Sequence, residues 1–212
     1  MNEKAALRRT LRSAYPGDEE RNRQSAALQR HVLAWAPFQQ AACVGGYVPL
    51  RREADVLPLL REVLRRGSLL ALPRVESEGV MTLRHVASLE ALVPGAYGIP
   101  EPPADAPLLA PERLSLLLVP LEGIDPTGMR LGKGGGYYDR LLARTDCPTL
   151  GMVMGWQWTE RIPAEPWDRP LYAAADQHGI HLFQTQERMN HSHGKEQEEK
   201  DRQAGCQAVP EG

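Results

Sequence analysis

The sequence predicts a single α/β domain, a three-layer α/β/α arrangement with a mostly parallel central sheet. Two observations lead to this prediction. Short apolar runs alternate along the chain with amphipathic helical segments, an order typical of parallel sheets whose strands are joined by helices. One such run, Leu114–Val119, is apolar at nearly every position, as expected for a central strand that is buried on both faces. The 212 residues, 42% of them hydrophobic, suffice for one such domain.

The N-terminal half of the chain combines three helical patterns with three strand patterns. Pro16-Gly17 ends the first helical pattern, and Asp18-Glu19-Glu20 begins the second, because a helix N-terminus favours negative charge. Pro37 is expected to end the second helix, and Gly67 the third. We predict helices over residues 2–14, 18–35 and 54–66, and strands over residues 41–48, 68–72 and 80–85.

The C-terminal half begins with a proline-rich stretch, residues 94–111, which predicts an extended surface loop. Apolar runs then predict strands over residues 114–119, 149–154 and 180–183, and a helix over residues 137–144. The domain is expected to cover residues 1–186.

A polar tail over residues 187–212 follows the predicted domain. The tail is charged and has almost no large apolar side chains, so it cannot bury enough surface to offset the entropy of ordering. We expect it to be disordered and to have no role in the chemistry. Two tail histidines, His191 and His193, are interpreted as incidental rather than as metal ligands.

Charge and cysteine usage narrow the classes of function. The formal net charge is −2, so no global basic field exists to attract a nucleic acid or an anionic membrane, and any basic site must be local. Cys43, Cys147 and Cys206 are odd in number and lack metal-ligand spacing, which favours reduced thiols. The first residues have no apolar core of a signal peptide, and no stretch reaches the ~20 apolar residues of a membrane span. We therefore expect a cytoplasmic monomer that binds a small anionic ligand.

The densest chemical signal is a glycine-rich run that lies just before a predicted helix, Gly128-Met-Arg-Leu-Gly-Lys-Gly-Gly-Gly-Tyr-Tyr-Asp-Arg140. Glycines let backbone N–H groups converge on an anion, and Arg130 and Lys133 add the positive charges that phosphates need. Asp139 is a candidate Mg²⁺ ligand, because Mg²⁺ combines carboxylates with phosphate oxygens. The spacing excludes a P-loop and a dinucleotide-binding fingerprint. A flexible linker is disfavoured, because linkers rarely mix glycine with charged residues and paired tyrosines.

Further candidate residues each have an ordinary structural explanation as well. Lys4, Arg8 and Arg12 share one face of the first helix, where they either grip a polyphosphate or form a solvated basic face. Glu53 follows the first strand, so it either contacts a ligand at the sheet edge or caps the next helix. Asp168 is either a second carboxylate near a metal or a turn aspartate.

Four blocks of sequence, in order, resemble the 5-formyltetrahydrofolate cyclo-ligase family, whose members are also called 5,10-methenyltetrahydrofolate synthetases. The blocks are Lys4-x-x-x-Arg8, Tyr47-Val-Pro…Glu53, Val119-Pro…Asp125-x-x-Gly128-x-Arg130-Leu-Gly-Lys-Gly-Gly-Gly-Tyr-Tyr-Asp139 and Gln157…Ile162-Pro…Trp167-Asp168. The segment Tyr97-Gly-Ile-Pro-Glu-Pro is similar to the family as well. The resemblance spans residues 4–183, and the third block is the most specific.

The resemblance implies a three-layer α/β fold and an ATP- and Mg²⁺-dependent reaction that closes 5-formyltetrahydrofolate to 5,10-methenyltetrahydrofolate, releasing ADP and phosphate. Lys133 and Arg130 are expected to be the catalytic charges, and Asp139 and Asp168 the Mg²⁺ ligands. ATP is expected to contact Lys4, Arg8, Arg130, Leu131, Gly132, Lys133, Gly134, Gly135, Gly136, Tyr137 and Tyr138. The folate is expected to contact Val48, Glu53, Lys133, Gly134, Gly135, Gly136 and Tyr137.

Two residues stay outside this pattern. Glu122 stands where many family members carry a small or apolar residue, which leaves the shape of its loop open, and Arg12 has no family position. Two other functions compete with the implied one: a non-catalytic folate- or RNA-binding module, and a different ATP-dependent enzyme on the same fold. The intact glycine-rich run, the paired carboxylates and the near-neutral charge argue against the non-catalytic module.

Overall fold

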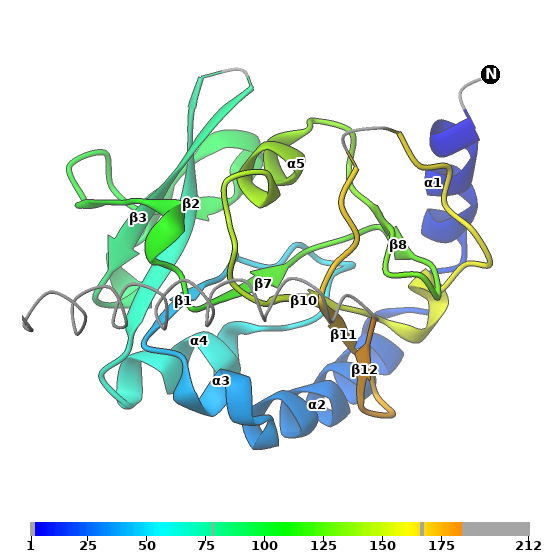
Figure 1. Ribbon diagram of the computed structural model, residues 1–212, viewed down its shortest axis with the longest axis horizontal. Coiled ribbons are helices and arrows are strands. Elements are labelled where there is room, and N and C mark those ends of the chain that lie inside the picture. The colour runs from blue at the N-terminus through cyan, green and yellow to red at the C-terminus, as the bar shows by residue number, and fades with distance from the viewer. Residues whose placement is uncertain (1–2, 78, 166–167, 184–212) are drawn as a thin grey trace, which may run out of the picture.

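The computed structural model describes residues 3–77, 79–165 and 168–183, and an eight-stranded sheet with the order β12-β11-β10-β7-β1-β2-β3-β6 lies at its centre (Figure 1). The strands are β1 (Cys43–Gly45), β2 (Leu69–Ser77), β3 (Val80–Val86), β6 (Leu108–Leu109), β7 (Leu116–Val119), β10 (Thr149–Met152), β11 (Ala173–Ala175) and β12 (Ile180–Leu182). Neighbours from β11 to β2 are parallel, whereas β12, β3 and β6 are antiparallel to their neighbours. The prediction of a mostly parallel sheet with a central strand near residues 114–119 is confirmed.

Helices cover both faces of this sheet. In Figure 1, α2 (Asp18–Ala34), α3 (Ala36–Gln40) and α4 (Leu57–Arg65) lie below the sheet, and α5 (Tyr137–Leu142) lies above it. The central strand β7 supplies both cores, because successive side chains of a strand point to opposite faces. Leu116 and Leu118 belong to the core below, and Leu117 and Val119 to the core above. All four side chains are fully buried, and the three-layer prediction is confirmed.

The first helix, α1 (Glu3–Ser13), is attached to the domain by a small apolar cluster of its own. Leu11, Leu131 and Ile162 form its buried centre. Leu131 belongs to β9 (Arg130–Leu131), which pairs with β8 (Gly123–Ile124) in a separate two-stranded ribbon. Helix α1 therefore packs against the strand that opens the glycine-rich run.

The proline-rich stretch that predicted a loop contains only short elements. A two-stranded ribbon, β4 with β5, lies in this part of the chain, and single 3₁₀ turns separate the remaining pieces. The bounds are η1 (Leu89–Ala91), β4 (Val93–Pro94), η2 (Ala96–Gly98), β5 (Pro100–Glu101) and η3 (Pro111–Arg113), with a further turn η4 (Gly155–Gln157) after β10. The stretch is more than a surface connection, because β5 lines a cavity.

The structure departs from the predicted elements at several places, and one of them is the β8–β9 ribbon, where no strand was predicted. Helix α3 begins directly after α2, because Pro37 lies in the first turn of a new helix, where its missing N–H breaks no hydrogen bond. Strand β2 continues through Pro73, because β1 pairs only with Leu69–Ala71 and leaves the rest of β2 with a free edge that tolerates proline. The sequence patterns do not predict β11, since its three alanines carry no β-branched or aromatic side chain.

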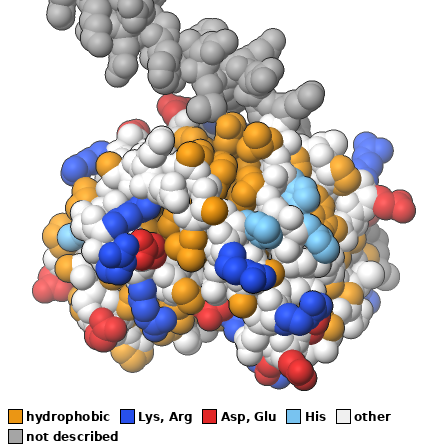
Figure 2. Space-filling view, turned by 90° about the horizontal axis from the view of Figure 1, so that it is seen from below, with side chains coloured by type: hydrophobic (Ala, Val, Ile, Leu, Met, Phe, Trp, Pro, Cys, Tyr) orange, Lys and Arg blue, Asp and Glu red, His pale blue; other side chains and the backbone are white. Residues whose placement is uncertain are grey.

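Elsewhere the predicted helices and strands are confirmed, with bounds shifted by a few residues. The predicted tail lies outside the described residues, as do Cys206, His191, His193 and Trp167. No helix in the described part of the chain is long and apolar enough to cross a membrane. The face below the sheet, shown in Figure 2, carries Lys and Arg side chains among acidic and apolar groups and has no continuous basic surface.

Candidate active site

A cavity of about 470 Å³ lies beyond the carboxyl ends of β1 and β7, the edge at which parallel α/β sheets bind ligands. The turn after β1, helix α1 and the glycine-rich segment 130–139 all contribute to its walls. Every residue that the sequence predicts for the site lines this one cavity: Lys4, Arg8, Val48, Glu53, Arg130, Leu131, Gly132, Lys133, Gly134, Gly135, Gly136, Tyr137, Tyr138, Asp139 and Asp168. The structure thus brings together residues that are far apart in the sequence.

The glycine-rich segment turns sharply between β9 and α5. Gly134 has φ +104° and Gly136 has φ +68°, which are backbone conformations that residues with side chains rarely adopt. Arg8 of α1 donates from Nε to the Gly132 carbonyl at 2.7 Å. A charged side chain of α1 therefore holds this turn, and the absence of side chains leaves its backbone open to the cavity.

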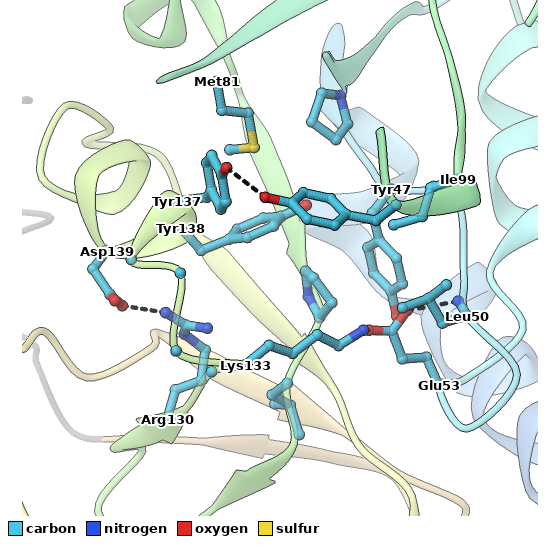
Figure 3. Close-up of a pocket in the computed structure, with 18 of the residues that line it drawn as sticks. Tyr47, Leu50, Glu53, Met81, Ile99, Arg130, Lys133, Tyr137, Tyr138 and Asp139 are labelled. Carbon is cyan, nitrogen blue, oxygen red and sulfur yellow. Dashed lines mark hydrogen bonds and ion pairs between the residues drawn. The ribbon is translucent and has the colours of Figure 1, made fainter. Parts of the chain in front are cut away.

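At one end of the cavity, which we call the polar end, acidic and basic side chains alternate. Arg130 pairs with Asp139 (Figure 3). The Arg130 side chain is only 5% exposed. Lys4 donates from Nζ to Asp168 at 2.7 Å, and Asp168 also acts electrostatically on Arg130. Burial lowers the pKa of Arg130, while Asp139, Tyr138 and Asp168 oppose the change. Two carboxylates therefore flank one buried guanidinium that stays protonated at neutral pH.

Lys133 extends from the glycine-rich segment across the cavity to Glu53 (Figure 3). Its Nζ lies 2.6 Å from Glu53 Oε1, and Glu53 Oε2 accepts a hydrogen bond from the Leu50 N–H at 2.8 Å. Glu53 does not cap the following helix, because Val56 occupies the N-cap of α4. Both oxygens of this buried carboxylate are therefore engaged, one by a cation and one by the backbone.

Two tyrosine hydroxyls lie close to Glu53. Burial, followed by the charge of Glu53, raises the pKa of Tyr47 and of Tyr138 well above the ordinary value. The Tyr47 hydroxyl is buried and has no hydrogen-bond partner among the described residues. Both hydroxyls therefore stay neutral in the physiological range and can donate hydrogen bonds.

The opposite end of the cavity, which we call the apolar end, is lined by Pro73, Val75, Met81, Ile99 and Pro100. Tyrosines extend over it: the hydroxyls of Tyr97 and Tyr137 are 3.1 Å apart, and the Gly79 N–H donates to Tyr137 at 3.3 Å. Tyr97 has φ +57°, which is uncommon for a residue with a bulky side chain. The β2–β3 hairpin, the loop around Tyr97 and the start of α5 therefore meet above the cavity.

Sequence reasoning missed several lining residues, including Tyr47, Leu50, Met81, Ile99 and Glu101. The apolar ones carry no signal that separates a cavity wall from a core, because both need the same side chains. Glu101 did carry a signal, since it lies in the segment from residue 97 that resembles the family.

The two residues outside the family pattern are partners in the structure. Arg12 donates from Nε and Nη2 to the two oxygens of Glu122, at 3.1 and 3.0 Å. The hydrogen bond to Glu122 raises the pKa of Arg12. Neither residue lines the cavity, so their pairing fixes α1 from outside the site.

Asp125 organises the loop that leads to the glycine-rich segment. Its Oδ1 accepts hydrogen bonds from the Thr127 and Met129 N–H groups, and its Oδ2 accepts one from the Ile162 N–H at 2.9 Å. The side chain is buried. Asp125 therefore has a structural task, which is to join the two segments that pack against α1.

Comparisons with known proteins agree with this picture. A model of the 5-formyltetrahydrofolate cyclo-ligase family matches residues 1–175. The 5-formyltetrahydrofolate cyclo-ligase of Escherichia coli K12 is 31% identical over 173 residues, which cover 79% of this chain and 94% of that protein. The NMR structure of Aquifex aeolicus 5,10-methenyltetrahydrofolate synthetase has a TM-score of 0.77 at 33% identity, covering 85% of this chain and 93% of that one. A Mycoplasma pneumoniae synthetase, 22% identical with a TM-score of 0.67, supports the fold over 82% of this chain and 99% of that one.

The fold and the cavity define an α/β enzyme in which a cationic, glycine-rich wall continues into an apolar pocket. The family match extends over both parts of this site. The chain belongs to the 5-formyltetrahydrofolate cyclo-ligase family, and it is an ATP-dependent cyclo-ligase. The resemblance seen in the sequence is confirmed.

Proposed function

We propose that the chain converts 5-formyltetrahydrofolate to 5,10-methenyltetrahydrofolate, with Mg²⁺ and ATP, releasing ADP and phosphate. Family membership supports the reaction. The observation that carries it is a single cavity lined continuously by residues 130–139, with cations at one end and apolar side chains at the other. A nucleotide and a folate bound in this cavity would meet at the glycine-rich segment.

The polar end is the proposed ATP site. Lys4, Arg8, Arg130 and Lys133 supply positive charge for the phosphates. The backbone from Leu131 through Gly136, with Tyr137 and Tyr138, forms the wall along which the phosphates would lie. An incoming phosphate would share Lys4 with Asp168, its carboxylate partner at 2.7 Å.

Asp139 and Asp168 are the proposed Mg²⁺ ligands. The donor set fits this metal, because both carboxylates line the polar end and Mg²⁺ is usually held by one or two carboxylates together with phosphate oxygens. No group of three or more acidic, histidine or cysteine side chains among the described residues could hold a metal on its own. The metal would therefore bind together with the nucleotide, and it would supply positive charge for the phosphates.

The folate is proposed to occupy the apolar end and to reach the glycine-rich segment. Val48, Glu53 and the run from Lys133 to Tyr137 line the same cavity and are the proposed folate contacts. Glu53 is fixed by Leu50 and Lys133, so it presents a carboxylate of defined position to the substrate. Lys133 lies between the two proposed ligands.

The proposed chemistry proceeds in two steps. The formyl oxygen bonds to the γ-phosphorus of ATP as the bond from that phosphorus to ADP breaks. The folate N10 then attacks the formyl carbon, the carbon–oxygen bond breaks, and phosphate leaves with the former formyl oxygen while N10 loses its proton to solvent. Lys133 and Arg130 offset the negative charge that develops on the transferred phosphoryl group. The other residues position the two substrates, as in other phosphoryl transfers.

The test is to mix the purified protein with 5-formyltetrahydrofolate and Mg-ATP, and to follow methenyl absorbance and phosphate release together. We expect both products in equal amounts, and neither when ATP or Mg²⁺ is omitted.

The competing functions predict other results. Tight folate binding without ATP consumption would instead support a non-catalytic module, and salt-sensitive RNA binding would support its RNA-binding form. ATP consumption with a different substrate would indicate another ATP-dependent enzyme. We further propose that the protein is a cytoplasmic monomer. Sedimentation of the purified chain would test its oligomeric state.

A further inference from the structure

Glu101, in β5, is a buried carboxylate that lines the cavity and accepts no hydrogen bond from any described residue. Its side chain is only 6% exposed. The nearest cation is Arg74, whose Nη1 lies 3.9 Å from Glu101 Oε2, beyond hydrogen-bond distance. Buried polar groups are nearly always hydrogen-bonded, because an unsatisfied one is unfavourable. Within the described residues no donor engages this carboxylate, and because Glu101 lines the cavity, a ligand bound there can supply one.

Arg74 balances the charge of Glu101 without serving as that donor. Its Nη1 donates to the Pro102 carbonyl at 2.7 Å, and its Nε is buried without a hydrogen-bond partner among the described residues. Glu76 lies 3.8 Å from the same Nε and shares the charge. The guanidinium therefore makes its hydrogen bond to the backbone and lies at a similar ion-pair distance, 3.8 and 3.9 Å, from Glu76 and Glu101.

Glu101 is held in place by packing. Its carboxyl group lies against Gly95, where an added Cβ would be 2.4 Å from the Glu101 Cδ. The backbone of Gly95 is extended, with φ −120°, so any residue could adopt it, and only the contact with Glu101 demands a glycine. Ile99 and Pro100, just before Glu101 in the chain, also line the cavity. The acceptor is thus fixed beside an apolar wall.

The other buried glutamate of the cavity differs in this respect. Glu53 has one oxygen on the Lys133 ammonium and the other on the Leu50 N–H. Glu101 has both oxygens free of protein donors within the described residues. Glu101 therefore has acceptor capacity that Glu53 has already used.

We propose that Glu101 recognises the 2-amino-4-oxopyrimidine edge of the pterin ring, where an exocyclic NH₂ lies next to a ring N–H. A carboxylate can accept two parallel hydrogen bonds from such a pair. The inference rests on the proposed folate substrate and makes Glu101 a residue that determines specificity for one edge of that substrate. Glu53 is then left to position the part of the folate nearest Lys133.

The test combines Glu101→Gln with a substrate that lacks the 2-amino group, 2-desamino-5-formyltetrahydrofolate, and measures dissociation constants by calorimetry. The substitution keeps the shape of the side chain and removes its charge. We expect 5-formyltetrahydrofolate to bind about ten- to a hundredfold more weakly, as for loss of charge-assisted hydrogen bonds, with an unchanged KM for ATP. The wild type should discriminate against the desamino substrate, and the variant should lose most of that discrimination. Equal weakening for both substrates, or unchanged binding of the natural one, would overturn the proposal.

Gly95→Ala provides a second variant, because it displaces the Glu101 carboxyl group without removing its charge, and it should weaken folate binding in the same direction. The matched control is Glu112→Gln, an exposed glutamate outside the cavity, which should change nothing. Melting curves of all variants establish that they are folded.

The outcomes separate this inference from the proposed reaction. If the wild type binds and converts the folate and Glu101→Gln binds it equally well, only the role of Glu101 is disproved. If the wild type binds 5-formyltetrahydrofolate without forming product, the proposed reaction is disproved, and the binding constants of the wild type and Glu101→Gln still test the role of Glu101.

Discussion

At the residue scale, Lys133 is the side chain that joins the two ends of the cavity. Its backbone belongs to the glycine-rich segment, and its ammonium reaches Glu53 at 2.6 Å. Its side chain is 40% exposed, against 17% for Lys4 and 5% for Arg130. A ligand in the cavity would therefore meet the Lys133 charge with little rearrangement.

We expect Lys133→Ala to lower kcat by about 10²–10³, as for the loss of one charge that stabilises a transition state. The KM for the folate should rise as well, because Glu53 loses the cation that orients it. Initial rates from methenyl absorbance measure both quantities. Arg144→Ala, in an exposed pair with Glu112 away from the cavity, is the control and should behave as the wild type. Normal turnover by Lys133→Ala would remove this lysine from the proposed mechanism.

The sequence located these charged residues but could not identify their partners. Arg130, Lys133 and Asp139 are conspicuous because their charges stand among glycines. Their pairing is a tertiary property: Lys133 meets Glu53 from a distant segment, and Arg130 meets Asp139 only because the glycine turn folds back. Patterns in a linear sequence name the chemical groups, and only the fold determines which groups neutralise one another.

At the element scale, helix α1 is fixed at its C-terminal end and reaches the cavity from its N-terminal part. Leu11 anchors it in an apolar cluster, and Arg12 pairs with Glu122. Arg8 and Lys4 lie one and two turns before Arg12 on the same face, and both line the cavity. The Arg12–Glu122 pair therefore positions residues of the proposed ATP site without touching it.

Arg12→Glu should raise the KM for ATP about two- to fivefold with little change in kcat, the range expected for a partly exposed ion pair. The double variant Arg12→Glu/Glu122→Arg restores opposite charges and should recover the wild-type KM. Initial rates at varied ATP, with the folate saturating, measure the effect. If the double variant is no better than Arg12→Glu alone, the pair does not position the helix.

Prolines show why some elements could be predicted and others could not. A proline lacks the N–H that continues a helix or a strand ladder, and the sequence signal is this local loss alone. Pro37 begins α3 instead of ending helical structure, and Pro73 lies within β2. Whether the missing N–H matters depends on which neighbour, if any, that position faces. That neighbour is supplied by the fold and is not encoded near the proline.

At the scale of the whole molecule, the burial of weak acids links stability to pH. Burial raises the pKa of Cys147 to about 12, and it also raises the pKa values of Cys43, Tyr47 and Tyr138. In the unfolded chain these thiols and phenols ionise near their ordinary values, about 8.5 and 10. The folded state therefore holds more protons in alkaline solution, so stability is full below about pH 8.5 and falls as the pH rises.

We expect the urea midpoint of unfolding to be nearly constant from pH 7 to 8 and to decline steadily between pH 9 and 10.5. Unfolding followed by circular dichroism at each pH provides the measurement. Cys147→Ala should flatten the first part of the decline, near pH 9. The substitution removes a thiol whose pKa rises to about 12 on folding. A midpoint that stays level to pH 10.5 in the wild type would contradict the role of these buried groups.

The layers of the fold could be predicted from the sequence, but the order of the strands in the sheet could not. The apolar run at β7 indicated a strand buried on both faces, and the structure places it between β10 and β1. The order of the strands had no comparable signal, because any buried parallel strand offers the same apolar surface to any other. Alanine-only β11 gave no signal of its own, although it pairs with both β10 and β12.

Lys4 and Asp168 are 164 positions apart in the chain, yet their side chains lie 2.7 Å from each other. On the ribosome, the partner aspartate is therefore added 164 residues after the lysine. A nascent chain that already carries Glu53 and the glycine-rich segment still lacks one carboxylate of the polar end. The order of synthesis therefore makes this pair one of the last contacts of the cavity to form, and unfinished chains cannot hold the complete set of ligand-binding groups.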